Sequence, residues 1–315
     1  MTPLAVVILA HADPVHLRRL ITALDDTPVV LHCDARTDDR SFAAMVDGLP
    51  GRVRVAPRQR TTVTSWSLVT AELQALKIAT TWTDARHIAV LSGADYPLLP
   101  MADIVQELRA WDGLTWIENT PVPVASWDTA RHPDGGLWRF QHRFLTRAHQ
   151  VLYWRDVPLR FPWKRSVPED LSLRAASQWK IYSRAHARAL HRLVDQRPDL
   201  VRFWSTTLVP DESFAASMLG SPKLLGGDAL APCPSGAWYM NWDNDRPGHP
   251  RWLSDNDFDQ LKSARWAPHL PLPGTTAGTL PIPDGEPTPY RKLFARKFRS
   301  SDPTVVDQVD AELRS

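Results

Sequence analysis

The sequence predicts an α/β fold with a single, mostly parallel sheet flanked by helices. Two observations support this prediction. Short apolar runs alternate with segments of helical periodicity through the first 120 residues, as in chains that cross from one strand to a parallel strand through a helix. The chain has 315 residues, of which 43% are hydrophobic, and this suffices for one large α/β domain or two small ones.

Five strands are expected in this first part of the chain, each a short apolar run that ends at polar residues or at a turn signal. Their ranges are Leu4–His11, Pro28–Asp34, Arg52–Pro57, His87–Leu98 and Leu114–Asn119. The carboxyl ends of parallel strands meet at one edge of a sheet, where ligands bind. The polar residues at these strand ends are therefore expected to converge: His32, Asp34, Ser92, Asp95 and Glu118.

Helices are expected between these strands. The first begins at Asp13-Pro14, because aspartate suits the N-cap, proline suits the first helical position, and leucines follow at helical spacing. Two more are expected from Ser65 to Thr80 and from Met101 to Trp111, where apolar residues share one face.

The second half of the chain is less regular. Residues 125–168 are rich in Trp, Arg, His and Pro, and we expect long loops there. A strand is expected over residues 177–183, followed by a helix over 185–196 and another helix in "DESFAASML". Residues 220–252 are expected to be loop, and residues 275–289 a Pro/Gly/Thr loop or linker. The chain closes with the basic segment "YRKLFARKF" and a short amphipathic tail.

Composition excludes several classes of protein. The net charge of +2 gives no support for nucleic acid or an anionic membrane as a partner. Cys33 and Cys233 are too far apart in sequence to suggest a disulfide framework or a metal site, which fits a reducing cytosol. No apolar run is long enough to span a bilayer, and the first apolar run lacks the features of a signal peptide. We therefore expect a cytoplasmic protein.

The segment "VPDESF" places two carboxylates, Asp211 and Glu212, directly after a proline and before an apolar run. One interpretation is that both acids cap the helix, with Asp211 at the N-cap, and the pattern alone favours it. The other is that Glu212 lies in the first helical turn, where the helix dipole keeps it ionised and able to accept a proton from a hydroxyl.

Two further patterns could bind a sugar nucleotide. The strings Asp243-Asn244-Asp245 and Asp255-Asn256-Asp257 could hold a divalent cation, but neither directly follows a buried strand, and Asp- and Asn-rich turns explain them more simply. In "LFARKF", Arg296 and Lys297 could neutralise a diphosphate without a metal, although an ordinary basic patch would look the same. His186 and His191 are five residues apart, which does not suit a metal pair on a helix.

The order of the motifs along the chain is more informative than the sequence of any one of them. "VILAHADPVHLRRL", "VVLHCD", "VLSGADYPL", "VPDESF", "HPRW" and "LFARKF" follow one another between residues 4 and 298. In this order they resemble the core-2/I-branching glycosyltransferase family, which includes β-1,6-N-acetylglucosaminyltransferases and peptide O-xylosyltransferases. The resemblance implies a GT-A-type fold, inversion at the anomeric carbon and catalysis without a metal or other cofactor.

The resemblance also implies roles for particular residues. Glu212 would be the general base that deprotonates an acceptor hydroxyl. The donor and its diphosphate would be bound by Arg251, Lys297, Asp34, His11, Ser92, Gly93, Asp95 and Tyr96. The acceptor would be bound by Glu118, Tyr239, Trp242 and Trp179. One catalytic domain would span residues 1–315, with a nucleotide-sugar half (1–120), an acceptor half (121–298) and a tail (299–315).

Two departures from the family pattern leave details open. Thr64-Ser65 replaces the Trp-Gly pair that usually precedes the third helix, and an insertion over residues 265–289 separates "HPRW" from "LFARKF". The expected donor is UDP-GlcNAc, then UDP-xylose, with UDP-glucose and UDP-glucuronate as alternatives. The acceptor would be a carbohydrate, a glycosylated small molecule or a peptide. A catalytically silent carbohydrate-binding relative and a metal-dependent sugar-nucleotide enzyme are the competing hypotheses.

Overall fold

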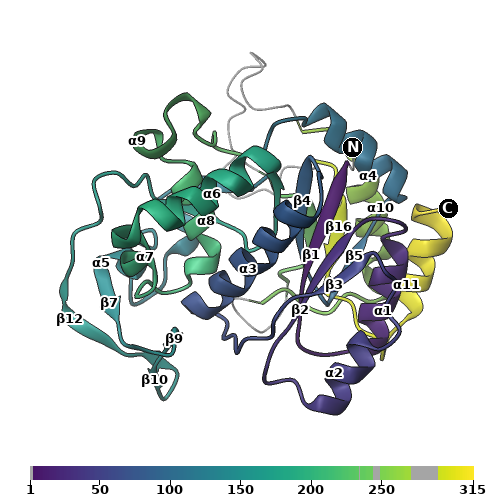
Figure 1. Cartoon of the computed structure of the whole chain (residues 1–315), viewed down its shortest axis with the longest axis horizontal. Coiled ribbons are helices and arrows are strands. Elements are labelled where there is room, and N and C mark those ends of the chain that lie inside the picture. Colours follow the sequence, from purple (N-terminus) through teal and green to yellow (C-terminus); the bar gives the residue numbers. More distant parts are fainter. Residues whose placement is uncertain (1–2, 234, 244–248, 271–289) are drawn as a thin grey trace.

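The computed structural model describes residues 3–233, 235–243, 249–270 and 290–315. Its centre is a five-stranded sheet in the order β14-β4-β1-β2-β3 (Figure 1). Four of these strands run parallel, namely β1 (Leu4–Ala10), β2 (Val29–Cys33), β3 (Val53–Val55) and β4 (His87–Ser92). Only the edge strand β14 (Lys180–Ser183) is antiparallel. The predicted α/β class and mostly parallel sheet are confirmed.

Helices cover both faces of this sheet because side chains of a strand point alternately to opposite faces. Val6 and Ile8 of β1 pack with α1 (Pro14–Ala23) and α4 (Met101–Ala110). Val7 and Leu9 face the other way and pack with α3 (Trp66–Trp82), α6 (Arg184–Gln196) and α8 (Phe214–Leu219). Both faces of the central strands are buried, which explains why they read as continuous apolar runs.

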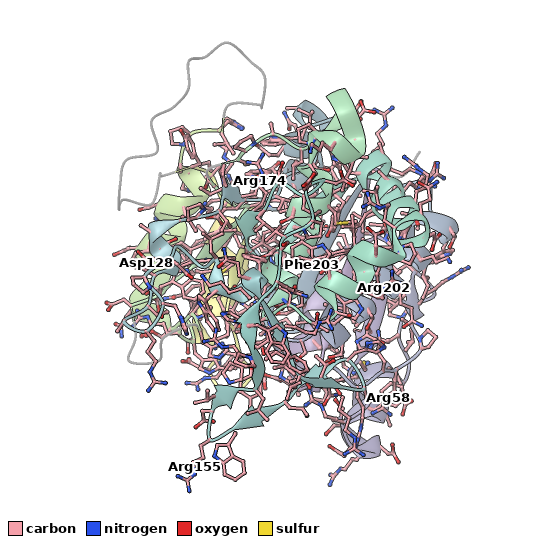
Figure 2. The ribbon with its side chains drawn as sticks, turned by 90° about the vertical axis from the view of Figure 1, so that its left-hand side faces the viewer. Arg58, Asp128, Arg155, Arg174, Arg202 and Phe203 are labelled. Atoms are coloured by element: carbon pink, nitrogen blue, oxygen red, sulfur yellow. The ribbon has the colours of Figure 1, made fainter. Side chains whose placement is uncertain are left out.

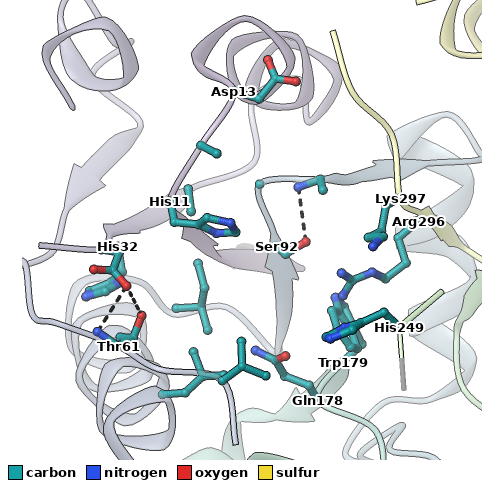
Figure 3. A pocket seen from close by; sticks show the side chains of 18 of the residues that line it. His11, Asp13, His32, Thr61, Ser92, Gln178, Trp179, His249, Arg296 and Lys297 are labelled. Atoms are coloured by element: carbon teal, nitrogen blue, oxygen red, sulfur yellow. Dashed lines mark hydrogen bonds between the residues drawn. The ribbon is translucent and has the colours of Figure 1, made fainter. Parts of the chain in front are cut away.

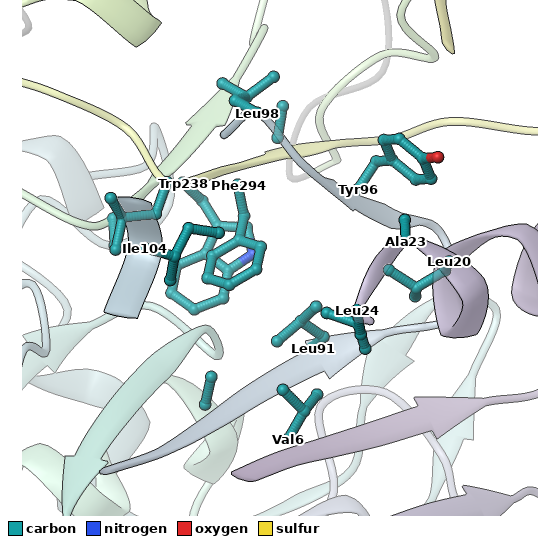
Figure 4. Packing of buried hydrophobic residues seen from close by; sticks show 14 of the residues in the cluster. Val6, Leu20, Ala23, Leu24, Leu91, Tyr96, Leu98, Ile104, Trp238 and Phe294 are labelled. Atoms are coloured by element: carbon teal, nitrogen blue, oxygen red, sulfur yellow. The ribbon is translucent and has the colours of Figure 1, made fainter. Parts of the chain in front are cut away.

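A second sheet extends the first core cluster. It has the order β15-β16-β5, built from β15 (Trp238–Met240), β16 (Phe294–Arg296) and β5 (Asp95–Pro97). Trp238 stacks on Phe294 at 5.0 Å between ring centroids, beside Leu91 and Ile104 (Figure 4). The strand expected over residues 87–98 is therefore two strands in two sheets, which is a correction. Asp95 accepts hydrogen bonds from Ser92 and closes the turn that separates them.

The expected strand over residues 114–119 is also wrong. Trp116 makes a single bridge to Ile181, and the chain then leaves the central sheet as β6 (Asn119–Pro121) to pair with β13 (Arg174–Ala176). The region 220–252, expected to be loop, contains β15 and the short helix α9 (Pro222–Leu225). The expected segment 275–289 lies outside the described residues.

Residues 125–168 form antiparallel ribbons and not only long loops. β7 (His142–Phe144) pairs with β12 (Arg160–Lys164), β8 (Thr146–Arg147) with β9 (Gln150–Val151), and β10 (Tyr153–Trp154) with β11 (Val157–Pro158). The two-residue turns Ala148-His149 and Arg155-Asp156 have positive φ throughout, between 45° and 64°. Tight hairpins of this kind usually contain Asn or Gly, so their sequences gave no signal.

The remaining elements are short or lie at the periphery. The α-helices not yet named are α2 (Asp39–Val46), α5 (Trp138–Gln141), α7 (Pro198–Trp204), α10 (Phe258–Trp266) and α11 (Thr304–Gln308). Single turns of 3₁₀-helix occur at Ala125–Trp127, Pro210–Glu212, Gly226–Asp228 and Asp255–Asp257, and a π-helical turn at Val309–Leu313. None of the helices in the described part of the chain has the length and apolar character needed to cross a membrane.

Candidate active site

A cavity of about 350 Å³ opens at the carboxyl ends of β1, β2 and β4. His11 follows β1, Asp34 follows β2, and Ser92 and Gly93 end β4, so four residues predicted to bind the donor line it together. Gly93 packs closely against β1, and a Cβ there would lie 3.1 Å from Ala10 Cβ, a tight contact. Figure 3 shows His11, His32 and Thr61 on one side of the cavity, and Trp179, Arg296 and Lys297 on the other.

The β2 side of the cavity carries a buried, ionised carboxylate. Asp34 accepts hydrogen bonds from the guanidinium of Arg36 at 2.9 Å, from the backbone N–H of Arg36 at 2.7 Å, and from the hydroxyl of Thr61 at 2.5 Å. Burial acts to raise the pKa of Asp34, but these hydrogen bonds outweigh it and hold the pKa well below its usual range. His32 accepts from the Gln59 backbone N–H, and burial lowers the pKa of His32, so its imidazole is neutral.

The β16 side carries two consecutive cations. The guanidinium of Arg296 lies 3.5 Å from the ring centroid of Trp179, and the Lys297 ammonium lies 4.8 Å from that of Trp252. Arg296 is buried, and its Nε and Nη1 have no hydrogen-bond partner among the described residues. Burial lowers the pKa of Arg296 to about 10, which leaves it charged at neutral pH. Lys297 was predicted to bind the diphosphate; the resemblance gave Arg296 no role, although the sequence marked it as a cation between apolar residues.

Asp95 and Tyr96 lie beneath the cavity and are not among the described residues that line it. Asp95 is fully buried and accepts from the Ser92 backbone N–H and hydroxyl and from Trp238 Nε1 at 3.1 Å. Tyr96 donates its hydroxyl to Asp310 in the C-terminal segment at 2.9 Å. Asp95 therefore supports the Ser92–Gly93 turn and Tyr96 joins β5 to the C-terminal segment, and their predicted contact with the donor stays a prediction.

Three of the other predicted residues lie on or near β15. Arg251 forms an ion pair with Asp257 at 2.5 Å and does not line the cavity, whereas its neighbours His249 and Trp252 do. Tyr239 is half-buried in β15, and Trp242 is exposed. The cavity is therefore lined by residues two before and one after Arg251, an offset that sequence matching could not resolve.

The second Asp-Asn-Asp string has a structural role. Asp257 is fully buried and accepts from Ser254, Asn241 and Arg251 at the start of α10. In the first string only Asp243 is described, and its backbone N–H donates to Asn241. Among the residues that the structure covers, no group of three or more His, Cys, Asp or Glu side chains is placed to hold a metal ion.

Glu212 lies in a 3₁₀ turn (Pro210–Glu212) that precedes α8, with its carboxylate 3.3 Å from Arg139 of α5. The expectation that Asp211 caps the helix and that the dipole ionises Glu212 is wrong, because Ser213 separates the turn from α8. Burial instead raises the pKa of Glu212, and Arg139 offsets part of this effect. Burial and the adjacent Glu212 carboxylate raise the pKa of Asp211 to about 7.

The backbone around this turn is held in an uncommon conformation. Val209 lies directly before the turn and Thr64 two residues before α3, and these β-branched residues have φ of 51° and 71°. The Val209 N–H donates to the Thr64 carbonyl at 3.0 Å, so the two strained residues stabilise each other. Strain of this kind is typical of functional sites. Thr64 occupies one position of the Trp-Gly pair that the sequence lacks.

Glu212 is not among the described residues that line the cavity, but a buried ion pair beside the cavity acts on it electrostatically. Lys180 donates to Glu72 of α3 at 3.1 Å and to the Gln178 carbonyl at 2.8 Å. Tyr182 donates to the second oxygen of Glu72 at 2.6 Å. Lys180 lowers the pKa of both Asp211 and Glu212, which places its positive charge near the turn. Because Gln178 and Trp179 line the cavity, the start of β14 joins the two sites.

The remaining acceptor candidates occupy two separate places. Trp179 lies under Arg296 in the cavity, on the side expected to bind the donor. Glu118 is exposed and lies next to Gly236, where a Cβ would approach the carboxylate to 2.9 Å. Lys292 donates to Ser235 and to the Gly236 carbonyl beside it. Of the polar strand ends expected to converge, His32, Asp34 and Ser92 line the cavity, whereas Glu118 and Asp95 are not among the described residues that do.

Comparisons with known proteins identify the family of the chain. The family model for "Branch: Core-2/I-Branching enzyme" matches residues 28–262. The chain is 24% identical over 245 residues to the beta-1,3-galactosyl-O-glycosyl-glycoprotein beta-1,6-N-acetylglucosaminyltransferase 4 of Mus musculus. That match covers 71% of this chain and 48% of the mouse protein, so the chain spans about half the length of this curated relative.

Solved structures give only distant likenesses. A glucose-1-phosphate thymidylyltransferase structure from Bacillus anthracis aligns with a TM-score of 0.30 and 10% identity, over 60% of this chain and 75% of that one. HddC from Yersinia pseudotuberculosis aligns with a TM-score of 0.28 and 14% identity, over 58% and 78%. Likeness at this level is too low to bear on function.

Proposed function

The chain belongs to the Core-2/I-branching enzyme family of glycosyltransferases, and from this premise we propose that it transfers a sugar from a UDP-sugar to an acceptor hydroxyl with inversion and without a metal ion. The observation that carries the proposal is the cation pair Arg296 and Lys297 in the cavity at the strand ends. Arg296 pairs with Asp95 only at 3.8 Å, and its buried Nε and Nη1 make no hydrogen bond to any described residue, so an anionic ligand at this position would satisfy them.

The proposed reaction assigns a step to each side of the site. Glu212 accepts the proton of the acceptor hydroxyl while the hydroxyl oxygen forms a bond to the anomeric carbon. The bond from that carbon to the UDP oxygen breaks on the opposite face, and UDP leaves with the electron pair. Arg296 and Lys297 stabilise the negative charge that develops on the diphosphate.

The raised pKa of Glu212 suits this role. A carboxylate whose pKa lies closer to neutrality is a stronger base than an exposed glutamate. The positive charges of Arg139 and Lys180 act against this rise in the pKa of Glu212. We propose that Asp34, at the other side of the cavity, contacts the nucleoside part of the donor, and that the donor sugar is GlcNAc.

A titration with nucleotide sugars tests this proposal. The purified protein is titrated by calorimetry with UDP-GlcNAc, UDP-xylose, UDP-glucose and UDP-glucuronate, all in the presence of EDTA. The proposal predicts that one UDP-sugar, with UDP-GlcNAc the first candidate, binds more tightly than the others. Binding that appears only when a divalent cation replaces EDTA would favour the metal-dependent alternative, and binding of none would favour a silent relative.

A further inference from the structure

We propose that the hairpin region of residues 142–164 docks on the surface of an anionic lipid bilayer. This region, called the cationic hairpin below, comprises the ribbons β7 to β12. Figure 2 shows Arg155, at the turn between β10 and β11, at the far end of this region, projecting away from the body of the molecule. The proposal goes beyond sugar transfer and does not depend on it.

The cationic hairpin concentrates exposed apolar side chains. Eleven large hydrophobic residues are exposed in the described part of the chain, and five of them fall between residues 152 and 163. They are Leu152, Tyr153, Trp154, Val157 and Trp163, of which the two tryptophans are each 67% exposed. Trp and Tyr are the residues that favour the interface between lipid headgroups and acyl chains.

The same region carries an excess of positive charge. It contains five Lys or Arg residues and one acid, Asp156. The cations are Arg143, Arg147, Arg155, Arg160 and Lys164, and all except the half-buried Arg160 are exposed. This local charge of +4 exceeds the net charge of +2 for the whole chain, so the rest of the chain is net negative. The overall charge, which alone gave no support for a membrane partner, therefore hides a strongly cationic surface.

The combination favours a bilayer over other anionic partners. A polysaccharide would use the aromatic rings and the cations, but it gains little from exposed leucine and valine and usually binds in a groove. The cationic hairpin is a projecting tip, and both its aliphatic and its aromatic side chains could enter the headgroup region (Figures 1 and 2). Anionic lipid attracts each nearby Lys or Arg by about 1 kcal/mol, or about fivefold in binding.

Hydrogen bonds join the cationic hairpin to residues 64–67, at the start of α3. Tyr153 hydrogen-bonds through its hydroxyl to Thr64 at 2.7 Å, the Val151 N–H donates to Ser65, and the Ser67 N–H donates to the His149 carbonyl. Val63, directly before Thr64, lines the cavity. Docking through this tip would therefore hold the cavity at a defined position relative to the lipid surface.

Vesicle co-sedimentation tests the proposal. Wild-type protein is expected to bind mixed phosphatidylcholine–phosphatidylglycerol vesicles but not pure phosphatidylcholine vesicles. High salt should release it from the mixed vesicles. The double variant Arg147→Gln/Arg155→Gln should bind about 25-fold more weakly, from about fivefold for each cation. Trp154→Ser/Trp163→Ser should lose about tenfold or more. Trp266→Ser, which removes a tryptophan of α10 that is 60% exposed, is the matched control and should bind like wild type.

Folding of each variant is checked by near-UV circular dichroism. Quenching of the wild-type tryptophan fluorescence by brominated lipid in the mixed vesicles gives a second readout that needs no variant, and the proposal predicts quenching. The proposal is overturned if the wild type binds neither kind of vesicle, or if it binds neutral and anionic vesicles equally. It is also overturned if the wild type binds a heparin column but does not bind the mixed vesicles. Hairpin variants that bind as tightly as wild type would also overturn it.

Discussion

Replacing Arg139 with methionine should shift the pH dependence of catalysis upwards. Arg139 Nη1 lies 3.3 Å from Glu212 Oε2, and its charge lowers the pKa of Glu212 against the effect of burial. Methionine has a similar side-chain length and can keep the packing of Arg139 over the Trp127 ring, but it carries no charge. Without the cation, the proton leaves Glu212 less readily, and a base must be unprotonated to act. The acid limb of kcat/KM therefore moves to higher pH.

The size of the shift follows from the geometry. Two unit charges at 3.3 Å interact by about 1.3 kcal/mol at the dielectric constant of water, which corresponds to about one pKa unit. The Glu212 side chain is 38% exposed and that of Arg139 18%, so solvent screens the pair, and measured ion pairs of this kind contribute about 0.2–1 kcal/mol. We expect an upward shift of between about half a unit and about one unit.

The assay is the profile of kcat/KM against pH, which reports groups of the free enzyme. Arg139→Lys is the control, because it keeps the charge and should leave the limb within a few tenths of a unit of wild type. An unchanged limb in Arg139→Met would refute the reasoning. So would equal shifts in both variants, since a structural disturbance and not the lost charge would then be the cause.

The other predictions concern the cation pair and the buried ion pair. Arg296→Met and Lys297→Met should each weaken UDP binding about 10- to 100-fold, because a charge-assisted hydrogen bond contributes about 1.5–3 kcal/mol. Calorimetry measures the affinity for UDP, and Arg299→Met, which removes an exposed cation, is the control. Variants of Arg296 or Lys297 that bind UDP as tightly as this control would contradict the assignment. Lys180→Met should lower the free energy of unfolding by about 3–5 kcal/mol, because it leaves the buried Glu72 carboxylate without its cation. The control is Arg197→Met, which breaks a more exposed ion pair with Asp199 and should lower the free energy of unfolding by less than about 1 kcal/mol. Denaturant unfolding measures both, and equal losses would show that burial of the pair has no special cost.

The regular part of the fold could be predicted because local pattern and burial agree there. Strands such as β1 are apolar throughout since both faces are covered, and the aspartate–proline start of α1 is a strong local signal. The Asp13 side chain accepts from the His16 N–H, as an N-cap should. The family membership and the GT-A-like class of the fold were also recoverable, because the order of six motifs carries more information than any one of them.

The features of the fold and of the site that could not be predicted depend on contacts between residues far apart in the sequence. The split between β4 and β5 follows from Asp95 turning back to Ser92 and from pairing with β16, about 200 residues later. The ribbons of residues 142–164 use tight turns without Asn or Gly, and their positive φ angles are imposed by the ribbons around them. The environment of Glu212 could not be read from "VPDESF", because Arg139 and Lys180, which lower its pKa, come from other elements.

The most direct test of the account is UDP release from UDP-GlcNAc in the presence of EDTA, measured for wild type and Glu212→Gln with a panel of oligosaccharide acceptors. The account predicts that wild-type turnover survives chelation, and that Glu212→Gln still binds UDP by calorimetry but turns over about 10²- to 10⁴-fold more slowly, as expected for loss of a general base. Turnover that stops with EDTA, or a Glu212→Gln variant as fast as wild type, would contradict it.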